Sequence, residues 1–233
     1  MAKKIAAGTT HLVIDIPIGK TAKIHRFSEG EEVAKKFESL AHHFGIKVIC
    51  DINETLEPAG RGIGPILEAR DVLYVLEQKT DRPLRLEAKS LRLAGKLLDL
   101  CYKEKGNPPA GGGEDEARKI LESGTALTKF QEIVKNQGGV HKITSDSLEL
   151  AKNKFDVRSS TSGKIKDINN HNLNIVAKIL GSPNDKKAGI YLLKKLDHSV
   201  SKNEHIFTLY SEDKYRLKEA EATLRNLPIF KIE

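Results

Sequence analysis

The sequence predicts an α/β fold, in which part of a mixed or parallel sheet is flanked by helices, followed by a C-terminal α+β domain. Two observations predict this arrangement. A strand, an amphipathic helix and a second strand follow one another near the N-terminus, which is the order of a βαβ unit. Beyond residue 150 the pattern changes from long helices to short strands that alternate with helices. We therefore expect two domains, residues 1–150 and 151–233.

The first elements are a short helix and a buried strand. Two lysines and several small residues precede Gly8, and a glycine commonly ends a helix. The apolar run THLVIDIPIG, residues 10–19, then predicts a strand that ends in a loop. Because a chain rarely begins on the last turn of a helix, we expect more polypeptide before this helix.

The next two elements complete the βαβ unit. Residues 28–45, SEGEEVAKKFESLAHHFG, predict an amphipathic helix with a capping box from Ser28 to Glu31. Residues 46–52, IKVICDI, are too apolar for a half-exposed strand, so we expect a strand inside a parallel sheet. Since a helix separates the two strands, they should lie parallel and adjacent or nearly so.

Helices dominate the following hundred residues. Residues 56–78 contain a glycine-rich loop, AGRGIGP, that leads into a helix with Pro65 near its first turn. Apolar residues at three- and four-residue spacing predict a long helix over 84–104. Two further helices are expected near 114–124 and 126–137.

The C-terminal part alternates strands and helices. Its predicted strands are FDVRSS, GKIKDI, GIYLLKKL, HIFTLYS and the closing IFKI, and its predicted helices are NHNLNIVAKILG and DKYRLKEAEATLRNL. The first of these strands begins at Phe155. This alternation predicts a separate α+β unit of about eighty residues.

Composition excludes several classes of protein. With 30% charged and 39% hydrophobic residues, the chain should be globular and not disordered. The net charge of +7 is spread among lysines that alternate with Glu and Asp, and aromatic residues make up 5%, so we expect no nucleic-acid partner. Asp15 interrupts the most apolar run, so we expect no membrane span. Two distant cysteines, Cys50 and Cys101, favour the reducing cytoplasm.

Two patterns resemble cofactor or metal sites. The glycine-rich loop places glycines at 60, 62 and 64, as dinucleotide-binding folds do, but Pro65 stands where their third glycine belongs. Close backbone packing is the favoured interpretation of this loop. The neighbouring His42 and His43 lack the spacing of metal ligands, and we expect them to complement the dipole of a helix C-terminus. We predict no metal site.

A third pattern resembles a cofactor-carrying hairpin. In NDKKAGIYLLKK, Asp185 precedes two lysines, Lys186 and Lys187, either of which could carry a lipoyl or biotinyl group. The segment before them predicts a helix, whereas such a hairpin needs a strand. An ordinary turn into a strand is therefore favoured, and an intact mass without the cofactor increment would dismiss the carrier hypothesis.

Three stretches together resemble one family. AKKIAAGTTHLVIDIPIGKTAK, DINETLEPAGRGIGPILEARDVL and DKKAGIYLLKKLDHSVSKNEHIFTLYSE are similar to the thymidine and pyrimidine nucleoside phosphorylases, and most to the subgroup with AMP phosphorylases. The resemblance extends over the whole chain in the same order. In this family the first stretch lies mid-chain, so the resemblance implies the C-terminal part of a longer polypeptide.

The resemblance implies a pentosyltransferase. The activity that the resemblance first suggests is that of thymidine phosphorylase, which converts thymidine and phosphate into thymine and 2-deoxyribose 1-phosphate. The alternatives are AMP phosphorylase, which forms adenine and ribose 1,5-bisphosphate, and a non-catalytic oligomerisation module. The implied partners are a nucleoside or nucleotide, with inorganic phosphate as co-substrate and no cofactor. We expect a cytoplasmic homodimer or larger homo-oligomer.

The resemblance assigns one substrate-binding residue, Lys3. In the family the first lysine of the pair hydrogen-bonds the pyrimidine carbonyl, and this position is Lys3 here. The catalytic residues are unknown and are expected upstream of this chain, which should therefore be inactive alone. Some members bind a monovalent cation through a glutamate that aligns with Asp71, but the change to Asp leaves no basis for assigning a metal.

We predict that the segment from Phe155 onwards is a compact unit. The pattern changes between residues 150 and 160, and the polar run SSTSG lies nearby. Limited proteolysis should therefore cut first within 138–163, because exposed polar connections are the preferred sites of nicking. Early cleavage inside GIYLLKK, with 140–170 intact, would contradict this boundary.

Overall fold

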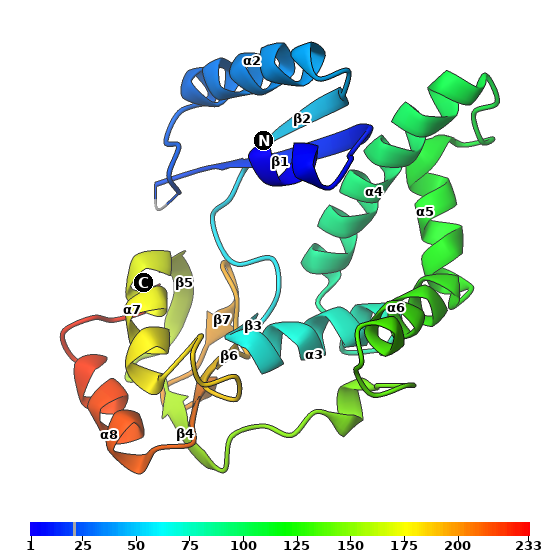
Figure 1. Cartoon of the computed structure of the whole chain (residues 1–233). Helices are drawn as coiled ribbons and strands as arrows, with labels where there is room; N and C mark the ends of the chain where they lie inside the picture. The colour runs from blue at the N-terminus through cyan, green and yellow to red at the C-terminus, as the bar shows by residue number, and fades with distance from the viewer. Residues whose placement is uncertain (21) are drawn as a thin grey trace. The chain divides into compact units, whose positions relative to one another are not determined.

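A computed structural model describes residues 1–20 and 22–233 (Figure 1). Its internal contacts define two compact units: residues 1–55 with 87–126, and residues 56–86 with 127–233. The second unit thus contains the predicted C-terminal strands together with the glycine-rich loop and the helix after it. The domain boundary at residue 150 stays a prediction. Among the described residues, no helix is long and apolar enough to cross a membrane.

The first unit begins with the predicted helix, strand, helix and strand. Helix α1 (Ala2–Ala6) ends before Gly8, whose φ of +67° is the left-handed conformation expected of a helix-ending glycine. Strands β1 (His11–Ile18) and β2 (Lys47–Glu54) pair in parallel over their whole length. The prediction of two parallel, adjacent strands is confirmed.

Helix α2 (Phe27–His43) joins these strands and covers one face of them (Figure 1). A Cβ atom added to Gly30 would meet Ile52 Cγ2 at 3.0 Å and Ile18 Cγ2 at 3.4 Å, so the helix backbone lies directly on the apolar side of the sheet. The predicted capping box from Ser28 to Glu31 is wrong. The carboxylate of Glu29 accepts hydrogen bonds from two backbone N–H groups just before the helix, and the helix therefore begins earlier.

Helices α4 (Leu84–Lys105, whose first three residues belong to the second unit) and α5 (Gly112–Glu122) complete the first unit. They meet at two glycines, because a Cβ atom on Gly113 would lie 2.1 Å from the Gly95 carbonyl oxygen. The Gly113 N–H also donates to Asp99 Oδ1 at 2.6 Å. Only residues without a side chain allow this close approach.

The second unit contains two antiparallel sheets. The first has the order β3-β6-β8-β4, and the second has the order β7-β5-β9. The strands are β3 (Gly62–Ile63), β4 (Asn153–Arg158), β5 (Gly163–Ile168), β6 (Gly189–Leu192), β7 (Ser199–Val200), β8 (His205–Ser211) and β9 (Phe230–Ile232). Strand β3 lies inside the glycine-rich loop, where the sequence predicted no strand.

The second unit also contains helices. They are α3 (Pro65–Leu76), α6 (Thr125–Asn136, whose first two residues belong to the first unit), the 3₁₀ turn η1 (Ser145–Ser147), α7 (Asn170–Leu180) and α8 (Lys214–Thr223). Pro65 occupies the first turn of α3, as predicted. Helices α7 and α8 pack against each other beside the strands (Figure 1).

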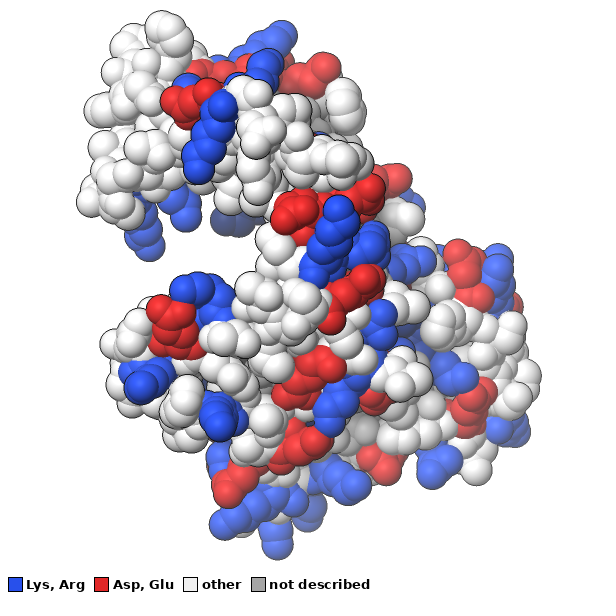
Figure 2. All heavy atoms as spheres, turned by 90° about the vertical axis from the view of Figure 1, so that its right-hand side faces the viewer, with Lys and Arg blue, Asp and Glu red and all other residues white. Residues whose placement is uncertain are grey.

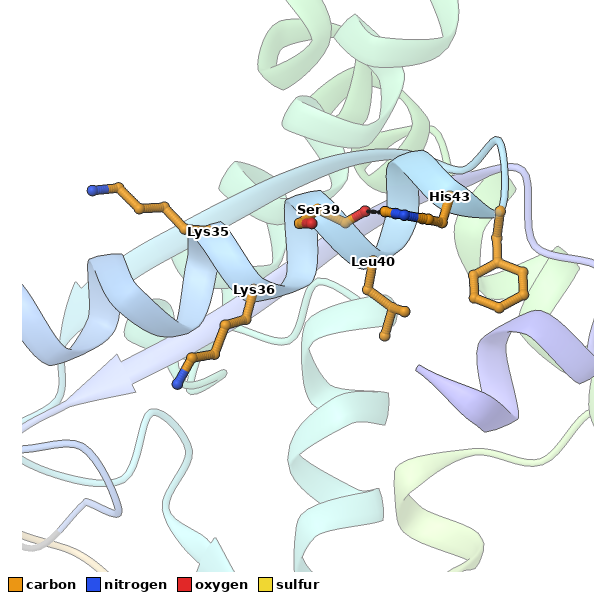
Figure 3. A pocket seen from close by; sticks show the side chains of 6 residues that line it. Lys35, Lys36, Ser39, Leu40 and His43 are labelled. Carbon is orange, nitrogen blue, oxygen red and sulfur yellow. Dashed lines mark hydrogen bonds between the residues drawn. The ribbon is translucent and has the colours of Figure 1, made fainter.

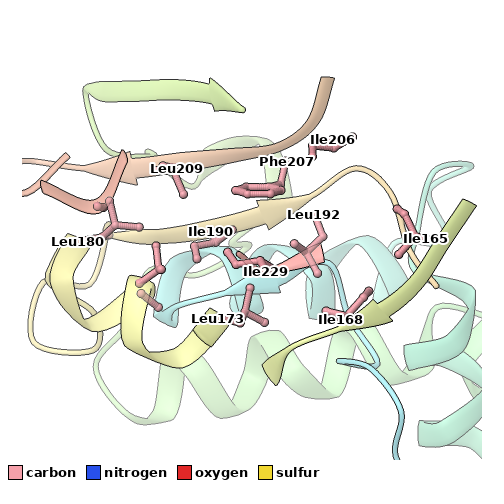
Figure 4. Packing of buried hydrophobic residues seen from close by; sticks show 14 of the residues in the cluster. Ile165, Ile168, Leu173, Leu180, Ile190, Leu192, Ile206, Phe207, Leu209 and Ile229 are labelled. Carbon is pink, nitrogen blue, oxygen red and sulfur yellow. The ribbon is translucent and has the colours of Figure 1, made fainter. Parts of the chain in front are cut away.

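The hydrophobic core of the second unit joins both sheets to α7 (Figure 4). Ile190 of β6, Leu209 of β8 and Leu180 of α7 are all completely buried. Ile165 and Ile168 of β5 point into the same cluster (Figure 4). Aliphatic side chains form almost all of this core, as the low aromatic content predicts.

Ile190→Ala should lower the free energy of unfolding by about 2–5 kcal/mol, because the substitution leaves a cavity in a closely packed core. Urea unfolding followed by circular dichroism measures this change. Tyr215→Ala is the control, since the Tyr215 side chain is 86% exposed, and it should stay within about 0.5 kcal/mol of wild type. Equal losses in the two variants would contradict the assignment of the core.

Candidate functional site

Lys3, the predicted substrate-binding residue, lies in the first turn of α1. Its side chain is exposed, so the ammonium is accessible to a ligand. The left-handed Gly8 follows this helix, and β1 begins three residues later, at His11. The structure thus supplies an accessible cation at this position, and its contact with a base stays a prediction.

Opposite α2, the other face of β1 and β2 carries charge. Asp15 and Asp51 occupy opposing positions in the two strands, where two carboxylates repel each other. Three cations of α4 compensate them: Lys89 lies 2.5 Å from Asp15, while Arg92, at 2.8 Å, and Lys96 both contact Asp51. Burial favours a higher pKa for Asp51, but these two hydrogen-bonded cations outweigh it and lower the pKa.

The same face continues with further polar pairs. Asn53 donates a hydrogen bond to Asp15 at 2.5 Å, and Glu104 of α4 contacts both His11 and Lys47 at 2.6 Å. Charge pairing therefore joins α4 to the strands. Because each carboxylate has a cationic partner, this layer is suited to holding α4 in place rather than to proton transfer.

The glycine-rich loop is fixed by the carboxylates of α3. Asp71 accepts hydrogen bonds from the N–H groups of Arg61, at 2.5 Å, and Gly62, at 2.7 Å. Glu68 accepts one from the Gly64 N–H at 2.9 Å. A loop that cradles phosphate would direct such N–H groups at its ligand. The structure therefore supports close packing, and not a dinucleotide site, for this loop.

Asp71 is buried, with 1% of its surface exposed. Burial raises the pKa of its carboxyl group, and the two loop N–H groups only partly oppose this effect. The guanidinium of the neighbouring Arg70 lies 4.4 Å from the ring centroid of Tyr191. Within residues 1–20 and 22–233, no three or more His, Cys, Asp or Glu side chains gather as metal ligands would.

A buried ion pair holds the start of the same loop. Glu57 is 5% exposed, accepts a hydrogen bond from the Leu196 N–H at 2.8 Å and pairs with Arg85. The Lys195 ammonium lies 3.8 Å from Glu57 and donates to the Gly60 carbonyl at 2.8 Å and to that of Pro58. The loop is thus tied to the segment after β6.

Lys195 has an unusual environment for a lysine. Lys195 is 8% exposed. Burial lowers the pKa of its ammonium from 10.5 to about 8, and the negative charge of the nearby Glu57 opposes this shift. Neither Glu57 nor Lys195 was predicted from the sequence. Only their positions in the sequence could have drawn attention to them. Lys195 follows the buried strand in GIYLLKKL, and Glu57 adjoins the glycine-rich loop.

The two lysines considered as cofactor carriers lie in the turn between α7 and β6. The Lys186 ammonium donates to the Pro183 carbonyl at 3.0 Å, and Lys187 pairs with Glu149 at 3.0 Å. A helix precedes this turn, as predicted, whereas a carrier hairpin joins two strands. The structure therefore favours an ordinary turn.

The outer surface of α2 has a shallow apolar hollow (Figure 3). Six residues line it: Lys35, Lys36, Ser39, Leu40, His43 and Phe44. His43 Nδ1 contacts the Ser39 carbonyl oxygen at 2.8 Å and thus belongs to the helix end, as expected of a C-terminal histidine. Leu40 and Phe44 are the apolar residues of this hollow, and Lys35, Lys36 and His43 are its basic residues.

Acidic and basic side chains alternate over the face drawn in Figure 2. Lysines and arginines there lie beside Asp and Glu and do not form a continuous basic stripe (Figure 2). A nucleic-acid groove would require such a stripe.

Known proteins show to which family the chain is related. Residues 164–229 match the pyrimidine nucleoside phosphorylase C-terminal domain. The chain is 41% identical to an AMP phosphorylase of Methanocaldococcus jannaschii over 233 residues, which is 100% of this chain and 45% of that protein. The chain corresponds to the C-terminal part of the pyrimidine nucleoside phosphorylase family. The resemblance recognised in its three sequence stretches is confirmed.

Two further relatives agree with this assignment. An AMP phosphorylase of Methanospirillum hungatei is 39% identical over 227 residues, which is 97% of this chain and 43% of the relative. An AMP phosphorylase of Methanococcus aeolicus is 42% identical over 234 residues, covering 100% and 45% respectively. The chain spans less than half the length of these relatives. All three are named for AMP, and none for thymidine.

Lys195 should make stability depend on pH. The folded protein binds this proton less tightly, with a pKa of about 8, than the unfolded chain, with a pKa of 10.5, so unfolding takes up a proton between these values. The free energy of unfolding should therefore rise with pH across this window, by roughly 1–3 kcal/mol. Urea titrations at a series of pH values should show that Lys195→Met loses this rise.

The matched control is Lys218→Met on α8, where the lysine is exposed. This variant should keep the wild-type dependence on pH, since the Lys218 side chain lies at the surface and leaves the environment of Lys195 unchanged. An unchanged slope in Lys195→Met would contradict the assigned environment of the ammonium.

Proposed function

We propose that this chain acts within an AMP phosphorylase, which converts AMP and inorganic phosphate into adenine and ribose 1,5-bisphosphate. The observation that supports this proposal is the 41% identity over the whole chain with a protein of that name. The sequence first suggested thymidine as the substrate. We propose AMP in its place, because the relatives carry the name AMP phosphorylase. Inorganic phosphate is the proposed co-substrate, and a homodimer or larger oligomer is the proposed assembly.

Lys3 has a role that follows from this chemistry. Phosphate attacks the anomeric carbon, the glycosidic C–N bond breaks, and its electron pair stays on the departing base. An ammonium beside the base stabilises this charge as it grows towards the transition state. Adenine has no carbonyl oxygen, so the Lys3 ammonium would act on a ring nitrogen. Its exposed position in α1 is compatible with that contact.

A chimera tests the proposed substrate. This chain replaces the matching segment of the Methanocaldococcus jannaschii AMP phosphorylase, and liquid chromatography measures release of free base from AMP, thymidine and uridine with phosphate. We expect adenine release from AMP to be fastest. The unmodified relative is the positive control, and circular dichroism establishes that the chimera is folded. Faster release of thymine, or no turnover by a folded chimera, would contradict the proposal.

In this chimera, Lys3→Ala should lower kcat for AMP by roughly two to three orders of magnitude, because it removes a contact that strengthens in the transition state. Lys4→Ala is the matched control, since Lys4 neighbours Lys3 in α1 and is also exposed. Its kcat should change less than about threefold. Equal effects of the two substitutions would remove the role assigned to Lys3.

A further inference from the structure

A cleft of about 250 Å³ opens in the second unit. Three segments of that unit border it: residues 59–61 of the glycine-rich loop, residues 80–85 at the start of α4, and residues 195–198 after β6. None of these residues has a part in the role proposed for Lys3. The side chains of this cleft therefore need their own explanation.

The lining of this cleft is strongly cationic. Its lining includes four cationic side chains, those of Arg61, Arg82, Arg85 and Lys195. Asp81 is the single acidic residue among the described lining residues. His198 adds a fifth basic side chain. Behind the lining, the carboxylate of Glu57 serves both Arg85 and Lys195. One carboxylate is thus shared by two of the lining cations.

The protein holds these cations in fixed positions. Arg82 donates to the Lys79 carbonyl at 3.1 Å, and Lys195 donates to two carbonyls of the glycine-rich loop. The Lys195 backbone N–H donates to His198 Nδ1 at 3.4 Å. A cationic group that is already ordered loses little conformational entropy when a ligand binds.

The cations also repel one another. Besides burial, the charges of Arg85 and Arg61 lower the pKa of Lys195, while the charges of Glu57 and buried Asp71 raise it. The result is still an ammonium that loses its proton more readily than an ordinary lysine. An anion in the cleft would reverse this balance, since opposite charge favours the protonated form.

We propose that this cleft binds a phosphate-class oxyanion, either inorganic phosphate or the phosphoryl group of a nucleotide. Guanidinium groups donate paired hydrogen bonds that match the oxygens of phosphate. The first turn of α4 adds the partial positive charge of a helix N-terminus beside them. The volume lies below the roughly 300–1,000 Å³ of typical ligand pockets, so a single phosphoryl group fits better than a large molecule.

Isothermal titration calorimetry of this 233-residue chain tests the proposal with three probes: inorganic phosphate, AMP and adenosine. Phosphate should bind saturably, and Arg82→Gln and Lys195→Met should each weaken its affinity at least about tenfold. Two variants are used because Lys195 also supports the loop, and thermal unfolding shows whether each one folds. Arg225→Gln, an exposed arginine after α8, is the matched control and should bind phosphate like wild type.

The probes distinguish the two sources of the anion. Equal affinities for phosphate and AMP would assign the site to the free ion, whereas tighter binding of AMP with none of adenosine would assign it to a nucleotide phosphoryl group. Lys3→Ala should leave phosphate affinity unchanged, so the result is independent of the proposed catalytic function. Absence of saturable binding at millimolar phosphate, or unchanged affinity in folded Arg82→Gln, would overturn the proposal.

Discussion

The carboxylate of Asp71 accepts hydrogen bonds from two consecutive N–H groups, and the path of the glycine-rich loop depends on this contact. With the loop held, Gly62 lies against the backbone of α3: an added Cβ atom would meet Leu67 at 2.4 Å. Gly64 is equally close to the Ala188 carbonyl oxygen, at 2.3 Å. These approaches allow β3 to pair with β6, so the loop becomes the outer strand of the C-terminal sheet.

Strong local patterns explain what the sequence could predict. The helices over 28–45 and 84–104 and the strands around them have clear apolar periodicity, and the structure contains all of them within a few residues. Strand β3 has two residues, too few to show any alternation, and its partner β6 is distant in sequence. Glu57 and Lys195 are polar residues whose burial arises only from tertiary packing, so no local rule identifies them. Lys3 was assigned from family resemblance alone.

Two buried aspartates show how the same side chain serves different purposes. Asp51 has two cations of α4 as partners, and its pKa is lowered. One carboxylate oxygen of Asp71 accepts hydrogen bonds from two backbone N–H groups, and burial raises the pKa of this carboxyl group. The first arrangement fastens a helix to a charged sheet face through ion pairs. The second fixes a turn of backbone through two neutral donors.

The second unit is built from two segments that are separate in the chain, residues 56–86 and 127–233. During synthesis the first segment leaves the ribosome well before its partner strand β6 exists, so its buried Glu57 and its β3 backbone must stay hydrated until then. Closing so long a loop costs entropy that only the late contacts repay. A shortened chain that starts at the C-terminal strands would also lack β3, and β6 would then present an unpaired edge to other molecules.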